Sequence, residues 1–334
     1  MSDAKGTFGH CACLYEHDEQ FLAAAVPFLI EGLELGQRAL AVGTPRHLAL
    51  LGPALGARGK DVDYADSAAF GHLPPRYLAA CHRYWKGGPG VRILAEPLGA
   101  GRSASEITAW TRMEAALNVT FASTSISMMC SYDARALHRD VIANALRTHP
   151  ERAAGADRSP SAGYTDPAEF ARSFGAVPLP DPPATAASFD FDGDLRDLRR
   201  FIAGSAAARG LAAGRAQLLV LAASEIGAYL KNRWPASTAV RVWEHQAAAV
   251  CDFRQPGGSI TDPFLGLRPA GLVPGDGDGL WLANQICDWM EIRPAATGGC
   301  AIQMQVSGDQ EAQPPGDQET AGSEPGNARI GDPG

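Results

Sequence analysis

The sequence predicts a chain of two α/β parts. The first is a mostly parallel sheet with helices on both faces, and the second is a two-layer α/β sandwich. Three observations lead to this prediction. Short apolar runs alternate with helical patterns over residues 1–150, which is typical of a parallel sheet. Residues 190–306 begin with two helical patterns and continue with paired strand patterns. A chain of 334 residues is long enough for both parts.

Strands and helices alternate along the first part. The expected strands are His10–Tyr15, Arg38–Val42, Val62–Ala65, Val91–Ala95 and Ile126–Ser131. The expected helices are Asp18–Leu35, Pro45–Leu55, Pro75–Trp85, Ser105–Ala122 and Ala134–Thr148. In the first of these helices Phe21, Ala25 and Phe28 recur at helical spacing, which gives one apolar face to pack on a sheet.

The second part has a different order of elements. Its expected helices are Asp194–Arg209, Ala213–Arg233 and Leu280–Asp288. Its expected strands are Thr238–Glu244, Ala248–Arg254, Trp289–Arg293 and Cys300–Val306. In each of the two pairs, the second strand follows the first after a short connection, so antiparallel pairing is expected.

Two further segments carry no strong periodicity. Residues 151–189 are rich in proline and glycine, and we expect a linker or strap. Residues 307–334 hold six acidic residues against Arg329 and almost no large apolar side chain, so we expect a disordered acidic tail. This tail accounts for most of the formal net charge of −8.

The composition narrows the classes of function. The sequence contains no run of eighteen apolar residues, so no membrane span is expected. The N-terminus lacks the apolar core of a signal peptide. Seven cysteines, an odd number, favour reduced thiols in a cytoplasmic protein. There is no basic stripe to neutralise phosphates, so no direct binding of nucleic acid is expected.

Several polar residues of the first part lie where a pocket is expected to form, since parallel sheets bind ligands at the carboxyl ends of their strands. The candidates for this pocket are His10, Tyr15, Glu96, Arg102, Glu114, Asn118, Tyr132 and Asp133. The first strand-to-helix turn has no glycine and no Gly-Lys-Ser/Thr, so a phosphate loop is not expected. The same residues also suit structural roles, as surface ion pairs or strand-end anchors.

A metal site is not expected from local spacing. His10 and Cys11 are neighbours in a strand and point to opposite faces, so they do not chelate together. Cys11 and Cys13 share a face, but no second pair with ligand spacing accompanies them.

The second part carries a candidate nucleotide site. Glu225 falls within the apolar stripe of its helix, where a carboxylate is unusual. Gly275, Gly277 and Gly279 alternate with aspartates directly before Leu280, where a helix is expected to begin, and helix N-termini bind phosphates. A plain surface loop and a carboxylate that reaches solvent are the structural alternatives.

This order of elements resembles the GHKL-type, or HATPase-like, fold of the bacterial anti-sigma regulatory serine/threonine kinases. The resemblance implies a catalytic Glu225 and an ATP site. That site would be formed by Glu225, Tyr229, Gln255, Gly257, Gly275, Gly277, Gly279 and Leu280. The segment Ile260–Pro263 resembles the entrance of the lid in that family. Two positions depart from the family pattern, because Tyr229 replaces the magnesium-binding asparagine and Gln255 replaces the adenine-binding aspartate. We therefore expect ATP binding to be weak or independent of magnesium.

The first part resembles the MEDS sensory domain. The likeness lies in His10–Tyr15, in Glu96-Pro97 with Gly101-Arg102, in Glu114 with Asn118, and in Tyr132-Asp133. It implies a RecA-like core without a phosphate loop and a small organic effector.

Together these features predict a cytoplasmic signalling and transcription regulator in which a sensory domain controls an anti-sigma-like module. A sigma factor or its antagonist is the expected partner, and a homodimer is compatible with the sequence. One alternative is an active protein serine/threonine kinase with Glu225 as base. Another is a metabolic enzyme that acts on a small organic molecule.

Overall fold

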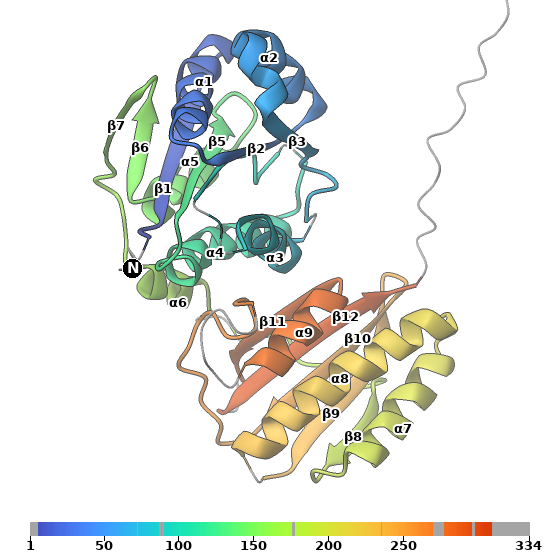
Figure 1. The fold of residues 1–334 in the computed structure, drawn as a ribbon. Coiled ribbons are helices and arrows are strands. Elements are labelled where there is room, and N and C mark those ends of the chain that lie inside the picture. Colours follow the sequence, from blue (N-terminus) through green and yellow to red (C-terminus); the bar gives the residue numbers. More distant parts are fainter. Residues whose placement is uncertain are drawn as a thin grey trace, which may run out of the picture.

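Each half of the chain forms an α/β body around its own sheet (Figure 1). The computed structural model describes residues 6–71, 73–86, 88, 90–99, 101–175, 178–234, 236–269, 277–295 and 298–308. One body contains a parallel-rich sheet and the other a separate antiparallel sheet, as the sequence predicts. Among the described residues, no helix combines the length and the apolar character that a membrane crossing needs.

The N-terminal sheet has seven strands in the order β3-β2-β4-β5-β1-β6-β7. They are β1 (Gly9–Tyr15), β2 (Arg38–Gly43), β3 (Val62–Asp66), β4 (Val91–Ala95), β5 (Ile126–Asp133), β6 (Glu151–Ala154) and β7 (Asp157–Pro160). The first six are parallel to their neighbours, and β7 returns antiparallel to β6. The five strands expected for residues 1–150 are present within two residues of their predicted ends.

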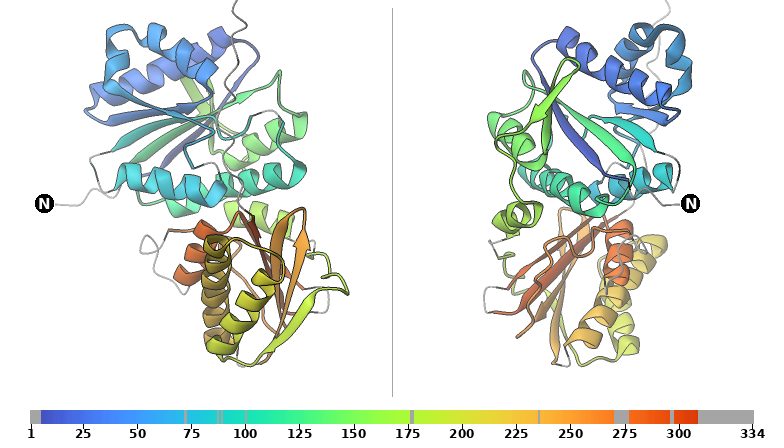
Figure 2. Two further views of the ribbon diagram at one scale, coloured as in Figure 1. Left: turned by 90° about the vertical axis from the view of Figure 1, so that its right-hand side faces the viewer. Right: turned by 60° about the vertical axis from the view of Figure 1, so that its left-hand side comes forward.

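Helices cover both faces of this sheet (Figure 2). They are α1 (Asp18–Glu34), α2 (Pro45–Leu55), α3 (Pro74–Trp85), α4 (Ala104–Thr120), α5 (Arg139–Thr148) and α6 (Pro167–Gly175), with a 3-10 turn, η1 (Gly56–Asp61). Side chains of β1 alternate between the two cores. Ala12 lies in the core with α3, α4 and α5, whereas Cys11 and Cys13 lie in the core with α1 and α2. The start of α5 is five residues later than expected, because the side chain of His138 caps it at Asp140.

Residues 151–189 are more regular than the expected linker. Within this segment β6 extends the N-terminal sheet in parallel with β1, and Gly155, at φ 60°, turns the chain into β7. Farther along, α6 packs on α4, and β8 (Ala187–Phe191) joins the second sheet. In the described part of this segment, residues 155–156, 161–166 and 178–186 run outside helices and strands, the last of these around the proline cluster. The difference arises because sheet edges and an apolar helix face order polar segments that have little apolar periodicity of their own.

The C-terminal sheet is antiparallel, with strand order β11-β12-β10-β9-β8. Its remaining strands are β9 (Thr238–His245), β10 (Ala248–Gln255), β11 (Trp289–Pro294) and β12 (Cys300–Ser307). Three helices lie together on one face: α7 (Leu195–Ala207), α8 (Ala213–Arg233) and α9 (Asp278–Ile286). Asp194 caps α7 by accepting from the backbone N–H groups of Arg196 and Asp197. The sequence therefore predicts the order of these elements correctly.

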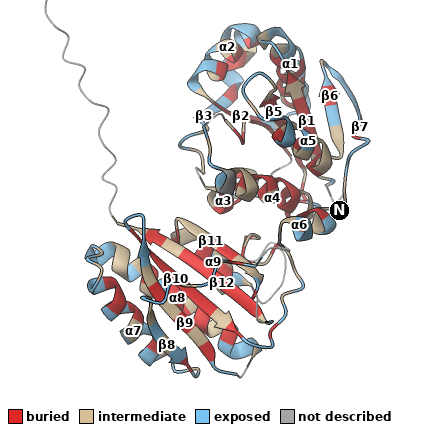
Figure 3. Cartoon of the chain, turned by 180° about the vertical axis from the view of Figure 1, so that it is seen from behind, coloured by how far each residue is buried: buried red, intermediate tan, exposed pale blue. Residues whose placement is uncertain are grey.

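The other face of this sheet is also largely buried. In Figure 3 the strands β10 and β12 are red along most of their length, and Asp252 on β10 is fully buried. A buried carboxylate needs partners, and Asp252 accepts hydrogen bonds from Arg254 at 2.6 Å and from Gln303 at 3.2 Å. This polar face turns toward the N-terminal body, because Arg293 on β11 donates to the carbonyl oxygen of Phe174 at the end of α6.

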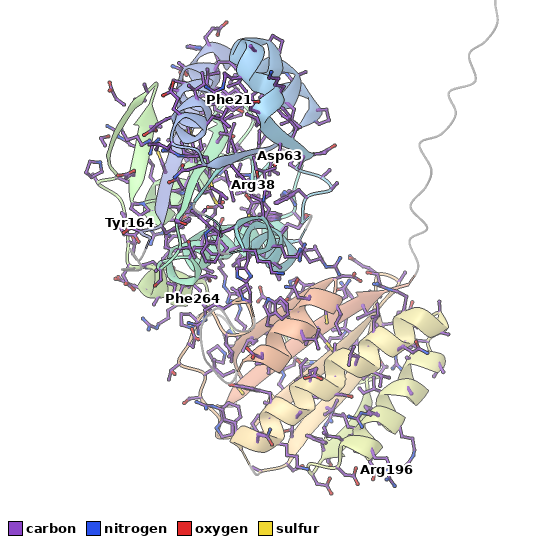
Figure 4. All side chains as sticks on the ribbon, in the orientation of Figure 1. Phe21, Arg38, Asp63, Tyr164, Arg196 and Phe264 are labelled. Carbon is purple, nitrogen blue, oxygen red and sulfur yellow. The ribbon has the colours of Figure 1, made fainter. Side chains whose placement is uncertain are left out.

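The two bodies share a hydrophobic contact. Phe264 belongs to the C-terminal half of the sequence, yet its side chain lies in the N-terminal core cluster that includes Tyr77 and Trp110. Figure 4 labels Phe264 at the junction of the two bodies. Leu267 packs against the same cluster. The segment after β10 is therefore anchored on the N-terminal body.

All seven cysteines of the chain lie among the described residues, where they are free and buried, as reduced thiols would be. The predicted acidic tail lies outside the described residues from position 309 onward.

Candidate functional site

The residues predicted to form a sensory pocket divide into three places. His10, Glu114, Asn118 and Tyr132 lie together on the face of the sheet that packs against α4 and α5. Tyr15, Glu96 and Asp133 lie at the carboxyl ends of their strands. Arg102 lies apart from both groups, at the cavity between the two bodies. The sequence therefore predicts one pocket from residues that the structure divides between two separate clusters and the cavity.

The first cluster is buried and compact. It joins His10 on β1, Glu114 on α4, Cys130 on β5 and His149, the residue after α5. Nε2 of His10 and Nε2 of His149 each lie 3.2 Å from Oε2 of Glu114. Sγ of Cys130 lies 3.6 Å from that same oxygen and 3.6 Å from Nε2 of His10. The side chains of His10 and His149 are 0% exposed and that of Glu114 is 2% exposed, so the four groups meet without access to water.

Outer hydrogen bonds fix both imidazole rings. The amide nitrogen of Asn118 donates to the carbonyl oxygen of Thr148 at 2.7 Å, so its Oδ1 accepts from Nδ1 of His10 at 3.0 Å. Nδ1 of His149 donates to the carbonyl oxygen of Ala145 at 2.7 Å. A ring whose single proton is on Nδ1 turns an unprotonated Nε2 toward Glu114, and the outer hydrogen bonds favour this tautomer for both histidines.

Burial affects the protonation of His10 and Glu114 in this cluster. Burial and the nearby His149 together lower the pKa of His10 to about 4, although contacts with Glu114 and Asn118 raise it, so the His10 ring is neutral near pH 7. Burial raises the pKa of Glu114, but hydrogen bonds from His10 and His149, together with their charges, lower it to about 2. Those bonds need a proton on Nε2, which a neutral ring protonated on Nδ1 lacks.

Unsatisfied polar atoms surround the same place. Oε1 of Glu114 and Nε2 of His149 are buried without a hydrogen-bond partner. The ring of Tyr132 lies edge-on to that of His149, with centroids 5.7 Å apart. Buried polar atoms are normally paired, so this concentration marks a place that a further group would complete.

The second cluster lies at the carboxyl ends of the strands, on the side of α1 and α2. The hydroxyl of Tyr15 lies 3.2 Å from Nε2 of His47, and Nδ1 of His47 lies 2.9 Å from Oε2 of Glu96. Oε2 of Glu96 also accepts from the backbone N–H of Thr44 at 2.9 Å. These contacts satisfy the three side chains internally. Asp133 stands beside them and is bound by Arg135.

A cavity of about 1180 Å³ lies between the two bodies. The N-terminal wall includes Arg102, Trp110 and Arg112, and the wall from the second sheet includes Trp243 and Glu291. Arg102 stacks over the ring of Trp110 at 4.8 Å and pairs with Glu106 at 3.7 Å. Both charged and aromatic groups therefore face this space.

The predicted nucleotide residues lie on the helical face of the second sheet, away from that cavity. A Cβ built on Gly279 would lie 2.7 Å from Oε2 of Glu225, so the start of α9 rests on this carboxylate. Leu280 is fully buried beneath it. Gly277 packs against Leu265, and Gly275 lies outside the described residues.

Tyr229 and Gln255 are the two positions that differ from the GHKL family pattern. Tyr229 is half-buried and its ring meets that of Trp234 at right angles, 6.1 Å between centroids. Gln255 is 1% exposed, and its Oε1 accepts from the hydroxyl of Thr238. Its amide nitrogen lies 3.4 Å from the carbonyl oxygen of Ala236, so the Gln255 side chain is bound within the protein. Gly257 follows at φ 74°, in the left-handed region that favours glycine.

Sequence reasoning missed Cys130, His149 and His47. Cys130 lies two residues before Tyr132 in the same strand, so strand alternation places both on one face and gave a usable signal. His149 follows a helix end, and His47 lies in the first turn of α2; neither position has a local pattern that indicates a site.

Comparison with known families gives a match for one part of the chain. Residues 9–150 match the family model described as MEDS, the methanogen/methylotroph, DcmR sensory domain. This range contains both clusters of the first sheet, and it confirms the resemblance predicted for the first part of the sequence. A MEDS sensory domain indicates a signalling or regulatory role for the protein. No curated protein matches the chain.

Proposed function

We propose that this chain is a cytoplasmic signalling and transcription regulator. In it the MEDS sensory domain responds to a small organic molecule and controls a C-terminal anti-sigma-like module that binds a protein partner. The match of residues 9–150 supports the sensory half. The order of the C-terminal elements and the contact of Glu225 with Gly279 support the second half. A sigma factor or its antagonist is the proposed partner.

The position of Phe264 carries this proposal. Residues Ile260–Pro263, which resemble a lid entrance, lead directly to Phe264. Its side chain is 2% exposed and lies in the core cluster of the sensory domain, together with Tyr77 of α3 and Trp110 of α4. A shift of α3 or α4 on effector binding would therefore move the lid segment with it.

Two arginines add to this connection. Nε of Arg76 on α3 donates to the carbonyl oxygen of Gln285 at 2.9 Å, and its Nη2 donates to that of Cys287 at 3.3 Å. These carbonyls belong to the C-terminal end of α9, whose negative dipole end favours a cation. Arg112 on α4 lies 3.5 Å from the carbonyl oxygen of Pro263, at the lid segment. The sensory domain thus holds the lid segment and the far end of the helix that begins over Glu225.

The module is proposed to bind nucleotide weakly or without magnesium. A phenol at Tyr229 is a poor ligand for a cation that requires several oxygen ligands in octahedral geometry. The amide of Gln255 is committed to Thr238 and to the backbone, so it is not available to an adenine ring. We therefore propose partner binding, and not phosphoryl transfer, as the output.

Affinity capture from the native cell tests the proposal. We expect the full-length protein to retain a sigma factor or its antagonist, identified by mass spectrometry. Phe264→Leu loosens the contact between the bodies and is expected to change the amount of partner retained. Phe201→Leu, at a half-buried position of α7, is the control and is expected to leave it unchanged. Capture of no sigma-factor regulator by the folded wild-type chain would overturn the partner assignment.

A titration with a fluorescent ATP analogue separates the module from an active kinase. We expect weak binding that magnesium does not strengthen. Tight binding that requires magnesium, together with phosphate transfer to the captured partner, would instead establish a protein serine/threonine kinase with Glu225 as base.

A further inference from the structure

We infer that the buried cluster of the sensory domain is a binding site for one divalent transition-metal ion, of which Zn²⁺ fits best. Its four protein ligands are His10, Glu114, Cys130 and His149. The inference concerns these residues alone and does not rest on the proposed function of the C-terminal module.

The distances between the ligand atoms fit a tetrahedral ion. Zinc bonds of about 2.0–2.1 Å to nitrogen and oxygen and about 2.3 Å to sulfur place neighbouring ligand atoms roughly 3.3–3.6 Å apart. Both imidazole Nε2 atoms lie 3.2 Å from Oε2 of Glu114. Sγ of Cys130 lies 3.6 Å from that oxygen and from Nε2 of His10. All four ligand atoms lie within 4.8 Å of one another.

The two histidines present lone pairs at the centre of the cluster. Each Nδ1 donates to an outer acceptor, Oδ1 of Asn118 for His10 and the carbonyl oxygen of Ala145 for His149. Metal-binding histidines are normally held in this way, with the second nitrogen bound to a carbonyl or carboxylate group. The arrangement leaves both Nε2 atoms free to coordinate an ion and unable to donate to Glu114.

A cluster without metal leaves these groups in an unfavourable state. The outer hydrogen bonds then leave no donor between the two Nε2 atoms and Oε2 of Glu114 unless one of these groups takes up a further proton, in a site that water does not reach. A water molecule at the centre fits this poorly, because the four separations of 3.2–3.6 Å, of the six between these atoms, point to a centre roughly 2.0–2.2 Å from them. That is shorter than a hydrogen bond of about 2.7 Å but equal to a zinc–ligand bond.

The types of ligand decide which metal is preferred. Two imidazoles, one thiol and one carboxylate form a borderline-soft set that suits Zn²⁺ and its analogue Co²⁺. Mg²⁺ and Ca²⁺ prefer sets made of oxygen ligands. Four protein ligands close the coordination sphere, which is typical of structural zinc sites and not of catalytic ones.

The expectation of no metal, drawn from the sequence, rested on the local spacing of His10, Cys11 and Cys13. That argument holds for these three residues, because Cys11 and Cys13 lie in the core on the opposite face of β1. The inferred ligands come instead from β1, α4, β5 and the end of α5, which meet only in the folded sheet. An ion there would tie α4, which contacts the C-terminal body through Arg112, to the centre of the sensory domain.

Cobalt substitution of the full-length protein tests the site. The purified chain is treated with a chelator, and Co²⁺ is then added. We expect one ion per chain, visible tetrahedral d–d bands and a near-ultraviolet charge-transfer band from thiolate to cobalt. Added Zn²⁺ should displace these signals stoichiometrically. Absence of the thiolate band and of stoichiometric metal in folded wild-type protein would overturn the inference.

Two cysteine variants locate the ligand. Cys130→Ser should abolish the charge-transfer band and weaken Co²⁺ binding by tenfold or more. Cys11→Ser is the matched control, because Cys11 is buried beside His10 but faces the opposite core. Asn118→Ala should lower metal affinity by roughly 10–100-fold while keeping the band, because it removes only an outer support of His10. An unchanged band in folded Cys130→Ser would exclude the assigned thiol and overturn the site as described.

Discussion

Gly279 rests directly on Glu225, because a Cβ at position 279 would lie 2.7 Å from Oε2 of that glutamate. No larger residue fits there unless the carboxylate moves. The start of α9 and the middle of α8 are thereby in contact, although they are more than fifty residues apart in the sequence. The contact explains why a glycine stands in the first turn of α9, where it otherwise weakens a helix.

Gly279→Ala and Glu225→Ala should be coupled. Gly279→Ala alone is expected to stabilise the protein less than the same change in an open helical position, because the Glu225 carboxylate must move aside, and to stabilise it more once Glu225 is truncated, with a coupling energy of at least about 0.5 kcal/mol. A double-mutant cycle measured by urea denaturation checks this. A coupling energy near zero would contradict the contact. Gly204→Ala in α7, where an added Cβ meets open space, is the control and should stabilise by about 0.5–1 kcal/mol.

The packing of α8 on α7 depends on Gly227. A Cβ there would lie 2.5 Å from Cδ2 of Leu198 and 3.4 Å from Cζ of Phe191. Gly227→Ala should therefore destabilise the protein by about 1–3 kcal/mol through overpacking. Thermal or urea unfolding measures the effect, with Gly204→Ala again as the same substitution in an open position. Equal stability of the two variants would show that the helices are not packed at this glycine.

Arg76 should stabilise the C-terminal end of α9. Arg76→Ala removes two charge-assisted hydrogen bonds to the carbonyl groups of Gln285 and Cys287, at an expected cost of about 1–2 kcal/mol. Hydrogen exchange of the α9 amides should become faster in this variant. Arg83→Ala, at an exposed position of α3, is the control and should leave that exchange unchanged. Identical exchange in both variants would contradict the role of Arg76.

Arg135 should make stability depend on pH in the acid range. Hydrogen bonds from Arg135 lower the pKa of both Asp18 and Asp133 below their ordinary values, against a smaller effect of burial. The ionised carboxylates thus add stability that is present above the ordinary pKa of aspartate, about 3.9, and is lost as the pH falls through the lowered values.

In urea denaturation, the wild-type midpoint should therefore fall more steeply than that of Arg135→Ala below about pH 4. The pairs are partly exposed, so added salt should reduce the difference. Parallel curves for the two proteins would show that the pairs contribute nothing.

Much of the fold could be predicted because its signals are local. The apolar face of α1 repeats at helical spacing, and the strands of the first sheet are short apolar runs that end near polar residues. The expected linker was the main exception. Its strand β6 pairs with β1 and β7 pairs with β6, and pairing at the edge of a sheet leaves little periodicity in a four-residue segment.

The candidate sites were predictable only in part. Glu114 and Asn118 share a helix face, and their spacing alone places them together. Cys130 and His149 join them from other elements. The spacing of these residues in the sequence does not predict the cluster, because the order of the strands in the sheet brings them together. For the predicted nucleotide site, the sequence could not show whether the amide of Gln255 is available to a ligand. Only the structure shows that this amide is bound to Thr238.

Outside residues 151–189, the sequence by itself determined which segments form helices and strands, because the period of apolar residues along a chain fixes the face that each element buries. It also identified the residues of the first part that the MEDS match covers. Tertiary structure alone decided that His10 meets Cys130 and His149, and that Phe264 lies in the core of the sensory domain. The physical reason is that such contacts depend on strand order and on the packing of the two bodies, and these arise from interactions between residues that are distant in the chain.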